Sequence, residues 1–168
     1  MKRRVLSILV DNTSGVLSRV AGLFSRRGYN IDSLTVGETE NPAFSRMTVV
    51  VRGDDLILEQ IQKQVAKLED VRSVKVLESG LSVCRELVLV TVNVTADERP
   101  AVVAIADIFR AKIVDVATDS MMIELTGNES KLSAFIKLLE GYQIKEMVRT
   151  GIAGLSRGAE RLLDGFDD

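Results

Sequence analysis

The order of secondary-structure patterns limits most strongly what this chain can fold into, because one order occurs twice within 168 residues. In the first half, four strand patterns and two amphipathic helix patterns follow one another as strand, helix, strand, strand, helix, strand. The second half repeats this order, and Val5 and Ile31-Asp32 recur as Val88 and Val114-Asp115 at a constant offset. Each half therefore has the order of the split βαβ, or ferredoxin-like, fold.

The repeat predicts an α+β protein made of two tandem ferredoxin-like βαββαβ domains. We place the first domain at residues 1–78 and the second at 83–150, joined near Glu78–Ser82. The remaining tail, 151–168, contains several glycines and is expected to be a mobile arm or a short helix. The predicted strands are 3–10, 30–37, 44–52 and 71–77 in the first domain, and 87–94, 113–117, 121–125 and 143–149 in the second.

Several predicted strands are apolar on both faces, although two helices can cover only one face of a ferredoxin-like sheet. Val5 to Val10, Val49 to Val51 and Leu87 to Val90 all show this pattern. The sheet face that the helices leave open must therefore pack against something else, either the other domain or a second chain. We expect a homo-oligomer.

Composition excludes several classes of enzyme. The chain has no histidine and one cysteine, Cys84, so it has no Ser-His-Asp triad, His-bound metal, intrachain disulfide or Cys-x-x-Cys pair. Lys and Arg number 22 against 24 Asp and Glu, and this near-neutral balance does not favour nucleic-acid binding. A short apolar run ends at Asp11 without a cleavage site, and no apolar stretch is long enough to span a bilayer. We expect a soluble, cytoplasmic protein.

The turn after the first strand, Asp11 to Leu17, carries the richest local chemistry. Free N–H groups at the start of a helix bind anions, and Gly15 would let a ligand approach the backbone. Asn12 adds an amide that can both donate and accept hydrogen bonds. Asn30 and Ile31 begin the next strand and offer backbone groups and an apolar wall. These features suit a small apolar amino acid. The alternative is structural: Thr13 or Ser14 is the N-cap, and Gly15 serves only the turn.

The same residues carry a resemblance to a known family. Residues 11–20 (DNTSGVLSRV) and 22–36 (GLFSRRGYNIDSLTV) closely resemble the small regulatory subunit of acetolactate synthase, also called acetohydroxyacid synthase. Residues 45–48 (SRMT), 58–61 (LEQI), 67–68 (KL) and 154–158 (GLSRG) also match. The resemblance extends over nearly the whole chain.

This resemblance implies that the first domain is an ACT domain, that two subunits pair edge to edge, and that valine binds at their interface. The implied valine contacts are Asn12, Gly15, Val16 and Leu17 from one subunit, with Asn30 and Ile31 from the other. It further implies a non-catalytic regulatory subunit that activates a separate large catalytic subunit and makes it sensitive to feedback. Thiamine diphosphate, Mg²⁺ and FAD would belong to the large subunit, with no cofactor in this chain.

The chain departs from the family pattern at Ser14, where a proline is common, and it lacks the ATP-responsive segment of fungal members. In the second domain, residues 95–100 (TADERP) are acidic and lack the glycine, so we expect no second valine site there. The main alternative is a stand-alone amino-acid sensor of the ACT type with another target. An RNA-binding module and an acylphosphatase-like enzyme share the strand order, but the first needs exposed aromatic residues and the second a complete phosphate loop.

Overall fold

The computed structural model describes residues 1–159, which form two compact units. The first unit combines Met1–Cys84 with the segment that begins at Ile152, whereas the second unit is Arg85–Gly151. The chain therefore passes from one unit to the other twice. As a result, the first unit contains segments from both parts of the sequence that flank the second.

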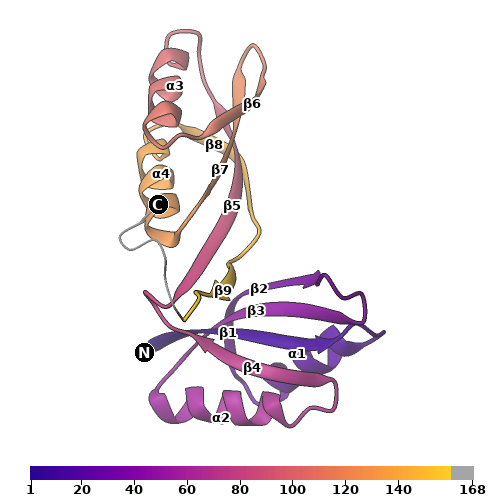
Figure 1. The fold of residues 1–168 in the computed structure, drawn as a ribbon. Coiled ribbons are helices and arrows are strands. Elements are labelled where there is room, and N and C mark those ends of the chain that lie inside the picture. Colours follow the sequence, from indigo (N-terminus) through magenta and orange to yellow (C-terminus); the bar gives the residue numbers. More distant parts are fainter. Residues whose placement is uncertain (160–168) are drawn as a thin grey trace. The chain divides into compact units, whose positions relative to one another are not determined.

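The first unit is a four-stranded antiparallel sheet with two helices on one face (Figure 1). The strand order β2-β3-β1-β4 places β1 and β3 in the centre and leaves β2 and β4 at the edges. Its elements are β1 (Lys2–Asp11), α1 (Val16–Arg26), β2 (Asn30–Glu38), β3 (Phe44–Gly53), α2 (Asp55–Ala66) and β4 (Val71–Leu77).

Local sequence explains where these two helices begin and end. The apolar stripe of α1, with Val20 and Phe24 among its members, is buried against the sheet. Gly28, with φ 66°, follows the end of α1 in the left-handed conformation that glycine adopts without strain. The start of α2 is capped by Asp54, whose Oδ1 accepts a hydrogen bond from the Ile57 N–H at 2.8 Å.

The second unit repeats the arrangement, with α3 and α4 on one face of the sheet (Figure 1). Its strand order is β6-β7-β5-β8. The elements are β5 (Ser82–Asn93), α3 (Arg99–Ile108), β6 (Lys112–Val116), β7 (Ser120–Gly127), α4 (Glu129–Leu139) and β8 (Gln143–Arg149). The predicted fold, two ferredoxin-like units in an α+β protein, is confirmed. β5 begins at Ser82, five residues before the predicted strand.

Each unit has its own core between helices and sheet. In the first, strand residues such as Leu6 and Val49 meet Phe24 of α1 and Ile61 of α2. In the second, the buried side chains are Val88, Val90, Val92, Val94, Val102, Ala106, Met121, Ile123, Leu125, Leu132, Phe135 and Leu139.

The segment after the second unit is a short strand, β9 (Ala153–Ser156), and the prediction of a mobile arm or short helix is wrong there. We call residues 152–157 the C-terminal strap. The strap lies on the sheet face of the first unit that the helices leave open: the Thr35 hydroxyl donates to the Ile152 carbonyl at 2.8 Å, and the Gly154 N–H donates to the Thr48 hydroxyl at 3.3 Å. Residues 160–168 of the predicted tail lie outside the described residues.

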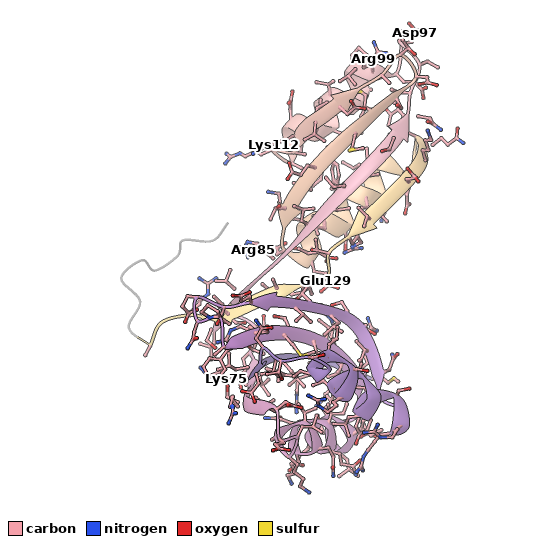
Figure 2. The ribbon with its side chains drawn as sticks, turned by 90° about the vertical axis from the view of Figure 1, so that its right-hand side faces the viewer. Lys75, Arg85, Asp97, Arg99, Lys112 and Glu129 are labelled. Carbon is pink, nitrogen blue, oxygen red and sulfur yellow. The ribbon has the colours of Figure 1, made fainter. Side chains whose placement is uncertain are left out.

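The strap covers part of the face for which the sequence suggested a second chain. Val50 lies outside the helix-covered core but is 1 % exposed, and Thr48 is 3 % exposed. The first unit therefore buries part of its open face with a segment of the same chain. Lys75, on β4, is exposed (Figure 2). In the first unit, the apolar pattern of the strands is thus not by itself a reason to expect an oligomer.

Candidate functional site: the turn between β1 and α1

The turn between β1 and α1 leaves the start of α1 without a side-chain cap. Gly15 is the N-cap residue, with φ 84° and no side-chain hydrogen bond to the helix, and the first turn contains no acidic residue. The alternative that Thr13 or Ser14 is the N-cap is therefore wrong. By contrast, α2 and α4 are capped by Asp54 and Asn128. The N–H groups at the start of α1 thus keep their capacity to bind an anion.

The equivalent turn of the second unit carries a reciprocal pair of hydrogen bonds just before α3, although α3 itself also begins without a side-chain cap. The Thr95 N–H donates to the Glu98 carboxylate at 3.0 Å, and the Glu98 N–H donates to the Thr95 hydroxyl at 3.2 Å. This reciprocal pair places a carboxylate of the chain itself at the helix start. Asp97 and Arg99 lie at the same end of α3 (Figure 2). This arrangement supports the expectation of no second amino-acid site.

Val16 and Leu17 follow Gly15 but offer different groups to a ligand. The side chain of Val16 is 4 % exposed and belongs to the core, so only its backbone faces the turn. Leu17 is 47 % exposed and provides an apolar side chain at the surface. The two residues can therefore supply an N–H donor and a hydrophobic contact, respectively.

Asn12 is held in place by the loop before β3. Its side-chain Nδ2 donates to the Pro42 carbonyl at 3.0 Å, and its backbone N–H donates to the Ala43 carbonyl at 2.8 Å. One N–H of the Asn12 side-chain amide is thus occupied, and Oδ1 is the group that suits a ligand ammonium.

Asn30 and Ile31 lie at the opposite end of the sheet from this turn. The register pairs Asn30 with Arg52, whereas Asp11, just before the turn, pairs with Phe44. Eight residues of β3 separate these positions, which is roughly 27 Å at about 3.4 Å per residue. The expectation from the residues alone, that Asn30 and Ile31 form a wall beside the turn, is therefore wrong within one chain.

Arg19 joins the turn, although the sequence-based site did not include it. An ideal Cβ on Gly15 would lie 2.8 Å from Nη1 of Arg19, and Nη2 donates to the Ser14 carbonyl at 3.4 Å. The signal was present in the sequence, because residues four apart lie on one face of a helix. The turn therefore combines uncapped N–H groups with a cationic side chain.

Two ion pairs tie the turn to the loop between α2 and β4 and to β4 itself. Arg19 Nε donates to Asp70 at 2.5 Å, and Arg72 binds Asp11 through two hydrogen bonds of 2.7 and 2.8 Å. The hydrogen bond from Arg19 lowers the pKa of the Asp70 carboxyl below its usual value. The hydrogen bonds that Arg72 donates to Asp11 likewise raise the pKa of Arg72. Both carboxylates of the turn region are thus engaged by arginines.

The lowered pKa of Asp70 predicts an acid-sensitive contribution to stability. A carboxyl whose pKa is lower in the folded chain stabilises the fold above its unfolded value, near 3.9, and loses this effect as pH falls through the folded value. Asp70→Asn should lower the melting temperature by a few degrees at pH 7 and hardly at pH 2. Thermal melts at both pH values measure this. Arg19→Gln should reproduce the shift at pH 7, and the double variant should add nothing; an additive double variant would contradict the pairing.

A pocket of about 410 Å³ lies elsewhere in the first unit, between the β4–β5 turn and the strap. None of the predicted site residues lines it; its lining residues are Val76, Glu78, Gly80, Leu81, Ser156, Arg157, Gly158 and Ala159. Within residues 1–159, no three Cys, Asp or Glu side chains are grouped so as to hold a metal ion. None of the described helices has the length and apolar character needed to cross a membrane.

Comparison with known proteins identifies the family. Residues 6–73 match the model of the ACT domain found in small subunits of acetohydroxyacid synthase, and residues 85–158 match the model of the acetolactate synthase small subunit. The first unit is therefore an ACT domain. Relatives that are similar over almost the full length of the chain specify the family.

The acetolactate synthase small subunit of Mycolicibacterium smegmatis is 48 % identical, over 91 % of this chain and 90 % of that protein. The isozyme 3 small subunit of Salmonella typhimurium is 48 % identical, over 93 % and 96 %. The crystal structure of the Thermotoga maritima small subunit has a TM-score of 0.86 at 42 % identity, covering 94 % of this chain and 99 % of that one. The chain belongs to the family of acetolactate synthase small subunits, as its sequence predicted.

Proposed function

We propose that this chain is a non-catalytic regulatory subunit that binds a large catalytic subunit of acetolactate synthase, activates it, and makes it sensitive to inhibition by valine. Membership of the small-subunit family supports the assignment of a catalytic partner. The observation that carries the regulatory part is the uncapped turn at Gly15, where a helix start keeps its anion-binding groups available.

The chemistry of the turn suits the zwitterion of a small apolar amino acid. The ligand carboxylate accepts hydrogen bonds from the N–H groups that follow Gly15, and the helix dipole adds about 0.3–1 kcal/mol. The ammonium donates to Oδ1 of Asn12, whose position is fixed by Pro42. Leu17 supplies an exposed apolar contact for the side chain.

The separation of the two groups of predicted contacts supports a site shared between two chains. β2 is an edge strand, so its outer side has no partner strand within the unit. In a two-fold dimer that pairs β2 with β2 about the middle of the strand, the strands run antiparallel, so the end of β2 that begins at Asn30 would lie beside the end of the partner's β2 that closes at Glu38. Glu38 pairs with Ser45, and Ser45 with Val10, so this is the end of the sheet at which the turn begins. The dimer thus brings Asn30 and Ile31 to the end where the partner's turn lies.

The remaining chemistry of the enzyme is assigned to the large subunit. Thiamine diphosphate, Mg²⁺ and FAD would all be bound there, and this chain would need none of them. The second unit, in which the Glu98 carboxylate is held by the Thr95 N–H just before α3, would serve assembly rather than a second effector site.

The test is reconstitution of the holoenzyme. The chain should co-purify with its large subunit, raise the turnover of that subunit, and confer inhibition by valine that the large subunit alone lacks. Sedimentation should give twice the 18.4 kDa mass of the chain. Valine binding without any effect on the large subunit would instead indicate a stand-alone sensor, and a monomer at micromolar concentration would exclude the shared site.

Removal of the Asn12 side chain should weaken valine binding. In Asn12→Ala the ligand ammonium loses its acceptor, and the expected loss is about 1–3 kcal/mol, or roughly 5- to 150-fold in affinity. Isothermal titration calorimetry measures the loss. Asn12→Asp is the matched control, because it keeps an acceptor oxygen and loses the donor to Pro42. Equal losses in both variants would show that the Pro42 contact, and not the ammonium, is what Asn12 provides.

A further inference from the structure

Arg19 adds a charged side chain to the turn, beside the N–H groups of the first helical turn. Its Nη1 lies 2.8 Å from where a Cβ on Gly15 would be, so the guanidinium covers the one residue of the turn that has no side chain. Its Nη2 donates to the Ser14 carbonyl. The side chain is 50 % exposed, and solvent or a ligand can therefore reach its charged end.

The orientation of this guanidinium is set from its other edge. Nε donates to the Asp70 carboxylate at 2.5 Å, and the Asp70 carbonyl accepts a hydrogen bond from the Asp11 N–H at 2.9 Å. The loop that carries Asp70 is thus tied to the last residue of β1. Because Nε is directed to Asp70, the two terminal nitrogens face the turn, where a fork of N–H groups can bind a carboxylate.

We infer that Arg19 is a specificity-determining residue for the ligand: its terminal nitrogens bind the free carboxylate of the amino acid beside the N–H groups that follow Gly15. This inference rests on the proposed function, in which valine binds at the turn, and it adds the group that separates a free amino acid from its amide. A neutral carboxamide keeps the planar shape of the carboxylate, but it replaces one acceptor oxygen with an NH2 donor and lacks the charge that Arg19 attracts.

The same helix provides an internal control. Arg26 lies four residues after Gly22, and its Nη1 is 3.1 Å from where a Cβ on Gly22 would be. The contact between glycine and arginine is therefore repeated at the last turn of α1. Gly22, however, lies inside the helix, where backbone N–H groups are already bonded within the helix. Arg26→Gln removes an equivalent charge from α1 without touching the turn.

The experiment is calorimetric titration of valine and of valinamide into the wild-type chain and into Arg19→Gln, Arg19→Lys and Arg26→Gln. The wild type should bind valine at least tenfold more tightly than valinamide. Arg19→Gln should bind valine about tenfold more weakly and valinamide no more weakly than the wild type. The ratio of valine affinity to valinamide affinity should therefore fall about tenfold. Arg19→Lys should be intermediate because it keeps the charge without the fork, and Arg26→Gln should match the wild type.

The possible outcomes separate this inference from the proposed function. If the wild type binds valine and Arg19→Gln keeps the ratio of valine to valinamide affinity, Arg19 does not bind the carboxylate, and the valine site stands without it. If Arg26→Gln lowers the ratio as much as Arg19→Gln, the effect is that of net charge and the inference is wrong. If the wild type binds neither compound, the proposed valine site is wrong, and so is the inference about Arg19. Circular dichroism melts of each variant identify any loss of folding.

Discussion

Gly15→Asp is expected to abolish inhibition by valine while the chain still activates the large subunit. The φ of 84° at Gly15 is one that Asp tolerates better than most residues, and its Cβ would displace only the flexible end of the Arg19 side chain, so the variant should fold. Its carboxylate would lie at the start of α1, accept hydrogen bonds from the helix N–H groups, and repel the ligand carboxylate. Each charge-assisted hydrogen bond that the ligand loses is worth about 1.5–3 kcal/mol. Valine affinity should therefore fall by at least about tenfold.

The matched control for this variant is Gly80→Asp. Gly80 has a φ of 83°, and no atom lies within 4 Å of where its Cβ would be. The Gly80→Asp substitution introduces the same charge and the same backbone strain in the same unit, but on the turn between β4 and β5. Inhibition curves of the two reconstituted holoenzymes make the comparison. Unchanged inhibition in Gly15→Asp, with the variant folded, would remove the turn from the valine site; lost inhibition in Gly80→Asp would show that the effect is general.

Gly154→Val should destabilise the first unit, because the C-terminal strap approaches the sheet too closely for a side chain. A Cβ at residue 154 would lie 2.7 Å from Leu77 Cδ1, 2.8 Å from Cys84 Sγ and 3.3 Å from the backbone oxygen of Val83. Overpacking of this kind costs about 1–3 kcal/mol of unfolding free energy. Denaturant titration of the full chain measures it, and the melting temperature should fall by roughly 4–8 °C per kcal/mol for a unit of this size.

Gly37→Val is the control for this variant. Gly37 lies in β2, with open space where its Cβ would be, and valine favours strands. It should therefore leave stability unchanged or slightly higher. If Gly154→Val is as stable as the wild type, the strap does not hold the position described for it on the sheet.

Sequence periodicity predicted the repeated fold because it depends on local patterns. The apolar stripe that includes Val20 and Phe24 specifies a helix, and the cap at Asp54 and the glycine at position 28 mark helix ends within a few residues. Family resemblance, confirmed by the comparisons, indicated the turn at Gly15. The valine contacts themselves stay predictions.

The contacts that sequence did not predict are long-range. The strap contains a four-residue strand, β9 (AGLS), whose sequence carries little strand signal. Its Gly154 N–H donates to the hydroxyl of Thr48, a residue 106 positions away in the sequence. The ion pair of Arg19 and Asp70 spans 51 positions. Neither contact can be inferred from periodicity, because both depend on how the finished sheet brings separate segments of the chain together.

The strap also has a consequence for the synthesis of the protein. It leaves the ribosome only after Arg85–Gly151 has been made, which takes several seconds at roughly 5–20 residues per second. During that interval the newly made ACT domain has its helices but lacks the hydrogen bond from the strap to Thr48. The open face of the sheet in the nascent chain therefore stays uncovered until the strap has been translated. A segment synthesised after the second unit thus completes the first unit.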